Sequence, residues 1–329
     1  MKQNNYLLNL LKVTIFSFLL IATAPVRAEI KVVTTIKPLH SLVANVMDGI
    51  GEPGLIIDGS ISPHSFTMKP SHAKMLEEAN VIFWIGEGIE TSMEGPLDSI
   101  AKGAEVIEFM ELDSITKLKF REESIFGDHD DHDDHDEDHD VHDGHDDHDD
   151  HDDHAGHEGH NHGEFDAHIW LDPSNAKEMV HEIAHELGHL DPSNKEKYEA
   201  NAEATMKALD KLISDVGKDI NSDAKFVVFH DAYQYFEERF GVRAAGALTL
   251  NTDVLPGAKQ IADIQDVIKD KGIKCIFSEP QFNPKIISTI AEDTNIKTGV
   301  CDPLGANIDS GKSLYFELIS NLGNELKGC

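Results

Sequence analysis

The apolar positions of this chain alternate between short runs and helical spacings over most of its length. The stretch from Ile30 to Thr35 is β-branched, and from Leu39 to Met47 apolar residues recur at helical spacing. Further strands are predicted at "GLIIDG", "VIFWIG" and "AEVIEF", and further helices at "KPSHAKMLEEA" and "SMEGPLDSIAKG". Alternation of buried strands with helices is typical of a parallel sheet that is covered by helices.

The second half of the chain repeats this alternation after a helical interruption. From Ser174 to Asn221 the pattern is helical, and "LDPSN" separates one helix from the next. Strand and helix then alternate again, from "KFVVF" through "VRAAGAL", "CIFSE" and "KTGVC" to a last helix at "KSLYFELISNLGNELKG". We predict an α/β fold of two parallel-sheet lobes, residues 29–172 and 222–329, which face each other across a cleft and are joined by a long helical connector, residues 173–221.

Residues 1–28 have the pattern of a secretory signal peptide. Lys2 and Lys12 flank a polar start, and the apolar run from Val13 to Ala22 is too short to cross a bilayer. Small residues around Ala28 offer a cleavage site. We predict that the chain is cleaved near Ala28 and exported to the periplasm.

Residues 128–162 break the pattern, because they consist almost entirely of Asp and His. Twelve histidines occur there, mostly at every third residue, and Val141 is the only aliphatic residue larger than alanine. A segment without apolar residues has no core to bury, so we predict a disordered loop. Its many imidazoles and carboxylates favour weak, overlapping metal sites. We interpret the loop as a low-affinity zinc collector; a histidine-rich zinc store is an alternative.

Charge and cysteine content narrow the classes of partner. The formal net charge of −33 argues against nucleic acid and favours cations. The three cysteines, Cys275, Cys301 and Cys329, allow one disulfide and one free thiol in an oxidising compartment. Every pairing is open from the residues alone, and no pair has the C-x-x-C spacing of a zinc ribbon.

Outside the loop, three histidines stand at or near the ends of predicted elements. His64 follows the strand "GLIID", His168 stands in "FDAHIWLDP", and His230 ends the strand "KFVVFH". Ligands of open α/β sheets bind at the carboxyl ends of the strands. Imidazole suits Zn²⁺, and three imidazoles leave one position of its tetrahedron for a fourth ligand. We therefore predict one metal site that the two lobes share.

Several blocks of the sequence resemble the zinc-binding periplasmic components of ABC importers, the ZnuA-type cluster. They are, in chain order, "PHSFTMKPSHAKMLEEANVIFWIGEGIE", "FDAHIWLDPSNA", "VVFHDAYQYFEERFGV", "IFSEPQFNP" and "DPLGANI". The resemblance covers essentially the whole chain after the signal peptide, and it assigns His64, His168 and His230 as the metal ligands. It implies a monomer without enzymatic activity, which captures Zn²⁺ and delivers it to a membrane permease.

Some details of the resemblance leave alternatives open. Pro63 stands where many zinc members have a Glu, so that Glu has no counterpart here. Related metal binders take a fourth ligand from the block that matches "CDPLG", so the fourth ligand here is either Asp302 or water. Manganese and iron members have Glu in place of His230, and the third imidazole favours zinc over a manganese or iron carrier. Carboxylates such as Glu279 are candidates for supporting the ligands from behind.

The resemblance also implies a disulfide. Family members often join a cysteine that opens a strand of the C-terminal domain to one near the C-terminus, and these positions correspond to Cys275 and Cys329. A closed loop of roughly 50 residues contributes about 4 kcal/mol in the chain-entropy model. Cys301 is then the free thiol.

One motif points instead to a zinc protease. The stretch "HEIAHELGHLD" contains H-E-x-x-H twice. Drawn as a helix, it places His181, His185 and His189 in a stripe beside an apolar face. No Met follows Met206, so the Met-turn of metzincins has no counterpart. We interpret the stripe as a helix surface with, at most, a weak zinc site, and the protease as the less favoured alternative.

Overall fold

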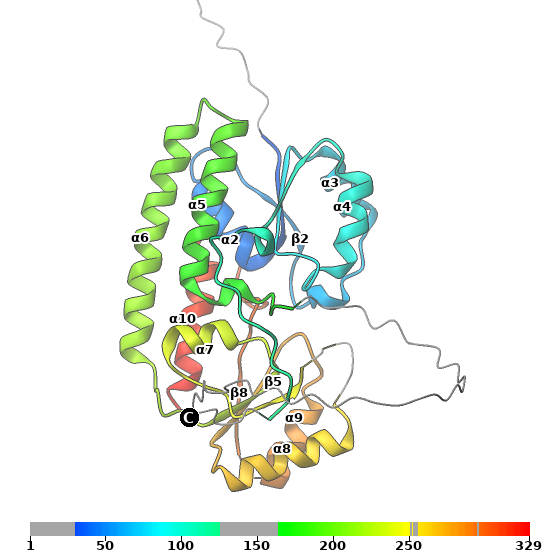
Figure 1. Cartoon of the computed structure of the whole chain (residues 1–329), viewed down its shortest axis with the longest axis vertical. Helices are drawn as coiled ribbons and strands as arrows, with labels where there is room; N and C mark the ends of the chain where they lie inside the picture. The colour runs from blue at the N-terminus through cyan, green and yellow to red at the C-terminus, as the bar shows by residue number, and fades with distance from the viewer. Residues whose placement is uncertain (1–29, 126–163, 251, 253–255, 295) are drawn as a thin grey trace, which may run out of the picture. The chain divides into compact units, whose positions relative to one another are not determined.

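The computed structural model describes residues 30–125, 164–250, 252, 256–294 and 296–329. The predicted signal peptide and the predicted loop at residues 128–162 lie outside these ranges. The described chain forms two four-stranded sheets with the strand orders β2-β1-β3-β4 and β6-β5-β7-β8, and neighbouring strands in both sheets are parallel (Figure 1). The predicted α/β class with two parallel-sheet lobes is therefore confirmed.

The first sheet belongs to the N-terminal lobe and is built around a fully buried strand. All residues of β1 are buried, as expected for a parallel strand that is covered on both faces. Pro38 and Pro70 stand in the first turns of α2 and α3, where the missing N–H removes no helical hydrogen bond. The elements are β1 Val32–Ile36, α2 Lys37–Val46, β2 Gly54–Ile57, α3 Pro70–Glu78, β3 Val81–Trp84, α4 Glu94–Ile100 and β4 Glu105–Glu108.

The second sheet belongs to the C-terminal lobe and repeats the topology of the first. Its central strand β5 pairs with β6 on one side and with β7 on the other. The strand predicted at "VRAAGAL" is shorter than expected and begins at Ala247, one residue after Gly246, which forms an antiparallel bridge with Ile125. Only glycine fits there, because a Cβ would lie 2.7 Å from the Ser124 carbonyl oxygen. The elements are β5 Phe226–His230, α7 Gln234–Phe240, β6 Ala247–Thr249, α8 Ala258–Asp270, β7 Cys275–Ser278, α9 Lys285–Thr294, β8 Lys297–Val300 and α10 Leu314–Leu326.

Two long helices, α5 Pro173–Leu190 and α6 Lys195–Asp219, lie side by side (Figure 1). In the sequence they stand between the strands of the first sheet and those of the second. The Asp172 carboxylate caps α5 by accepting the Ser174 N–H at 2.7 Å, and Pro173 opens the helix. Helix α2 packs against both long helices, and α10 packs against α2 and α6. Among the described residues, no helix is both long and apolar enough to cross a membrane. The connector boundaries at 173 and 221 stay a prediction.

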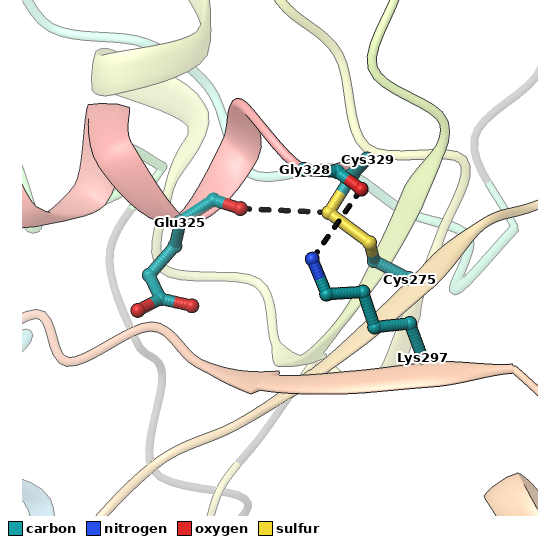
Figure 2. Close-up of a disulfide and its surroundings, with 5 residues drawn as sticks. All are labelled: Cys275, Lys297, Glu325, Gly328 and Cys329. Atoms are coloured by element: carbon teal, nitrogen blue, oxygen red, sulfur yellow. Dashed lines mark hydrogen bonds between the residues drawn. A yellow bond between two sulfur atoms is a disulfide. The ribbon is translucent and has the colours of Figure 1, made fainter.

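A disulfide ties the end of the chain to the second sheet. Cys275, the first residue of β7, is bonded to Cys329 beyond α10 (Figure 2). Beside it, the Lys297 ammonium of β8 donates to the Gly328 carbonyl at 3.4 Å. Cys301 is a free, buried thiol, and burial raises its pKa well above the ordinary value. The structure thus contains the pairing that the resemblance implied and leaves Cys301 free.

Candidate metal centre

The structure brings the three predicted histidines together from three separate segments. His64 lies in a short 3₁₀ turn, Pro63–Ser65, after β2; His168 directly precedes the turn Ile169–Leu171 that leads into α5; His230 is the last residue of β5. One ring nitrogen from each lies within 4.8 Å of the other two. The ring centroids of His168 and His230 are 5.2 Å apart, and those of His64 lie 5.6 and 6.0 Å from them.

Carboxylates behind two of the rings fix which nitrogen faces the centre. Asp166 Oδ1 lies 2.7 Å from His168 Nδ1, and Glu279 Oε1 lies 2.7 Å from His230 Nδ1. When ionised, each carboxylate only accepts hydrogen bonds, and the Nδ1 that it faces then carries the ring proton while Nε2 presents a lone pair. This assignment follows from the hydrogen-bond network. The support of His230 by Glu279 agrees with the sequence-based interpretation.

The two Nε2 atoms of His168 and His230 face each other at 3.3 Å. Two lone pairs at this distance share no proton, so they repel unless a cation lies between them. Tetrahedral Zn²⁺ with nitrogen ligands at about 2.0–2.1 Å separates those nitrogens by about 3.3–3.4 Å. The spacing of the rings therefore fits one zinc ion that both bind.

The electrostatic surroundings of the two buried rings differ. Burial, and then the neighbouring His230, lower the pKa of His168 well below its ordinary value. Burial also lowers the pKa of His230, but Glu279, Asp231 and Asp166 outweigh it, so the net shift is upward. Burial raises the pKa of Asp166 to about 7, against the hydrogen bond from the His168 backbone N–H. Anionic neighbours around His230 favour a cation at this place.

Asp302 lies outside the group that the three histidines form. Its Oδ1 accepts hydrogen bonds from the Leu304 N–H at 3.0 Å and from the Gln281 side chain at 2.9 Å. Its Oδ2 accepts from the Ala306 N–H at 2.6 Å. Gly305, with a φ of +68°, allows the tight turn that brings these N–H groups to the carboxylate. In the described residues Asp302 therefore organises its own loop, and the structure does not bring it to the imidazoles.

A pocket of about 200 Å³ lies against the three imidazoles and is also lined by Arg121 and Asp231. The Arg121 guanidinium pairs with Asp231 at 2.8 Å and with Glu237 at 2.5 Å. Burial raises the pKa of Glu237 to about 7, and Arg121 opposes that rise. Sequence reasoning did not find this ion-pair group, because its members are far apart in the chain and carry no motif.

The two chain segments that flank the predicted loop lie next to each other beside this pocket. Lys119 and Phe165 form an antiparallel bridge, and the Asp166 N–H donates to the Leu118 carbonyl at 2.8 Å. Arg121 lines the pocket on one side of the loop sequence, and His168 lines it on the other. The loop itself lies outside the described residues, but both of its stems are anchored at the candidate metal centre.

The H-E-x-x-H helix is α5, and its histidines lie apart from the candidate centre. His181, His185 and His189 are all exposed. The second group of potential ligand atoms in the described chain consists of Glu182, His185 and Glu186, without His181. The rings of His185 and His189 are 4.6 Å apart, but no group of three ligand atoms in the described chain contains two histidines of α5, as the metal site of a metalloprotease requires.

Two parallel sheets of identical topology, with three imidazoles gathered from both halves of the chain, define a two-lobed α/β substrate-binding protein. Comparison with known proteins gives the family. The chain belongs to the ZnuA family, "zinc-uptake complex component A periplasmic", whose model matches residues 32–329.

Named relatives and a solved structure agree with this assignment. The "High-affinity zinc uptake system protein ZnuA" of Brucella abortus is 50% identical over 91% of this chain and 91% of its own length. The protein of the same name from Paracoccus denitrificans is 39% identical, with 94% of each chain covered. A crystal structure of ZnuA superposes with a TM-score of 0.69 at 22% identity, covering 90% of this chain and 98% of the other.

Proposed function

We propose that this chain binds Zn²⁺ tightly in the periplasm and delivers it to the permease of an ABC importer. The observation that carries the proposal is the convergence of His64, His168 and His230, whose ring nitrogens lie within 4.8 Å of one another. Zinc is the cargo, and the chain performs no chemistry on it. The names of the relatives, which are zinc uptake proteins, support this reading.

The donor set favours zinc over manganese and iron. Three neutral imidazoles suit Zn²⁺, whereas Mn²⁺ prefers carboxylate and water oxygens. The Nε2 separation of 3.3 Å between His168 and His230 suits the short bonds of a tetrahedral ion. Water completes the tetrahedron where Asp302 keeps its present contacts; a rotation that frees Asp302 from its backbone partners would make it the fourth ligand.

The loop at residues 128–162 serves as a low-affinity collector that hands zinc to this centre. The segments that flank it pass the pocket beside the imidazoles, where Arg121 and His168 line the wall, so an ion released by the loop is released near the tight site. Each loop site should be weak, because fixing the backbone costs about 1–2 kcal/mol for every residue ordered. The signal peptide at residues 1–28 directs export, and the mature protein acts as a monomer.

The test is a comparison of zinc content and affinity among five purified proteins, the wild type and four variants. His64→Ala, His168→Ala and His230→Ala should each lose the tight site. His181→Ala, which removes an exposed histidine of α5, should keep it. Competition by Mn²⁺ should be weak in the wild type. A tight site that survives all three substitutions in the cleft, or that prefers Mn²⁺, overturns the assignment.

Delivery requires its own measurement. Cells that lack the gene should grow poorly in zinc-depleted medium, and the wild-type gene should restore growth only where a zinc permease is present. Restoration without a permease would indicate a zinc store. Cleavage of peptides by the purified protein would revive the protease alternative.

A further inference from the structure

The exposed face of α5 carries a second cluster of metal-binding groups. Glu182, His185 and Glu186 each offer one ligand atom, and these atoms lie within 4.8 Å of one another. Positions three and four residues apart share a face of a helix, so all three side chains project from the same side of α5. His185 Nδ1 lies 3.0 Å from Glu186 Oε1, which shows that the imidazole and the carboxylate already meet.

Two further groups surround this cluster. The rings of His185 and His189 are 4.6 Å apart between centroids. Glu105, the first residue of β4, reaches the same place from the neighbouring sheet. Burial raises the pKa of Glu105, and so does Glu186, to whose carboxyl group it is hydrogen-bonded. His189 and His185 act in the opposite direction.

The cluster contains more carboxyl groups than positively charged side chains. Within the described parts of the chain, no lysine or arginine forms an ion pair with Glu105, Glu182 or Glu186. The cationic partner that these three carboxyl groups have is therefore imidazole, which is charged only when it is protonated. Two carboxylates in contact repel unless a proton or another cation is shared between them.

We propose that Glu182, His185 and Glu186 form a second binding site for Zn²⁺ or a similar borderline divalent ion, with Glu105 as an additional carboxylate. One imidazole with carboxylates is a donor set that zinc accepts. The site is partly exposed and has one central imidazole in place of three, so it binds more weakly than the cleft. In this proposal Glu182 and Glu186, rather than His181, complete the site.

The second site is independent of the cleft. His185 lies twelve residues beyond Pro173, the first residue of α5, which corresponds to about 18 Å along the helix axis at 1.5 Å per residue. No residue contributes to both groups of ligand atoms. An ion bound at α5 therefore leaves the three imidazoles of the cleft free to bind another.

Residue-resolved histidine footprinting on the full-length mature protein tests the site. Diethyl pyrocarbonate modifies neutral imidazole nitrogen, and tandem mass spectrometry gives the rate at each histidine. Zn²⁺ added beyond the amount that fills the cleft and the loop should slow the modification of His185 by about tenfold or more, because the bound ion occupies the nucleophilic nitrogen. His181, on the same helix but outside the cluster, should react at an unchanged rate.

Two variants separate a built site from general zinc adsorption. In Glu182→Gln/Glu186→Gln the protection of His185 should disappear, whereas Glu178→Gln, an exposed change on the same helix, should retain it. Circular dichroism establishes that α5 is intact in both proteins. Unprotected His185 in the wild type, or protection that persists in the double variant, overturns the proposal. Chelator competition on the same samples reports the cleft separately, so the two assignments can fail independently.

Discussion

Replacement of Glu279 by glutamine should weaken zinc binding without removing any ligand. In the wild type, Glu279 Oε1 accepts from His230 Nδ1 at 2.7 Å and from the His230 backbone N–H at 3.3 Å. Both side chains are almost fully buried, at 4% exposure for His230 and 3% for Glu279. Glutamine keeps an oxygen for the ring N–H but removes the negative charge that makes His230 Nε2 a better donor to a metal.

The expected magnitude follows from the kind of hydrogen bond that is lost. A bond to a charged group contributes about 1.5–3 kcal/mol, and a neutral bond about 0.5–1.5 kcal/mol. The difference of about 1.4 kcal/mol corresponds to about tenfold in affinity. Outer partners of metal-binding histidines typically change affinity by about 10–100-fold, so we expect Glu279→Gln to fall within that range.

Competition with a chelator of known affinity measures the change in the cleft without interference from weaker sites, because the chelator outcompetes those sites. Glu178→Gln, which neutralises an exposed carboxylate on α5, is the matched control and should bind zinc as the wild type does. Thermal unfolding of the zinc-free proteins shows whether Glu279→Gln folds normally. A correctly folded Glu279→Gln protein with wild-type affinity would refute the role of the carboxylate behind His230.

Three further outcomes can be checked with the same protein. Serine at Cys275 and Cys329, which are 54 residues apart in sequence, should lower the free energy of unfolding by about 4 kcal/mol in urea titrations, and an unchanged midpoint would contradict it. Deletion of residues 128–162 should reduce the number of zinc ions measured by equilibrium dialysis while keeping one tight site; unchanged stoichiometry would make the loop a spacer. Zinc affinity should fall as the pH is lowered, and the fall should begin above the ordinary histidine pKa of about 6.5, because the carboxylates around His230 outweigh burial and raise its pKa. Isothermal titration from pH 8 downwards, about one pH unit per step, tests this sign.

The fold was predictable because its central strands are buried on both faces. β1 and β5 are continuous apolar or β-branched runs that are fully buried, and such runs are recognisable without knowledge of their partners. The extent of β6 was not predictable, because regular strand pairing starts only at Ala247, although Ala245 and Gly246 already exchange backbone hydrogen bonds with β5. Burial alone therefore predicts that a segment is internal, and pairing decides whether it is a strand.

The position of a residue in the candidate site was predictable where the topology of the sheet determines that position. His230 ends a central strand, and parallel strands bring such positions to one edge. Asp166 stands two residues before His168, so its role had a local signal that was not used. The role of Arg121 and the pairing of Glu105 with Glu186 had no local sequence signal. Contacts between segments that are far apart in the chain cannot be recognised from residue spacing. A helical projection of α5 shows His185 and His189 but not the strand beside them.

The contacts between the two halves of the chain limit how zinc can leave the cleft. The Lys37 ammonium of α2 is buried and donates to the carbonyls of Gly305, Ala306 and Ile308 at 2.8, 3.2 and 2.7 Å. A separation of the lobes would break these three hydrogen bonds from a charged group, each of which contributes about 1.5–3 kcal/mol. We therefore expect local rearrangement at the imidazoles, induced by docking to the permease, rather than wide opening. Small-angle scattering should give nearly the same radius of gyration with and without zinc, and a large expansion on zinc removal would exclude this route.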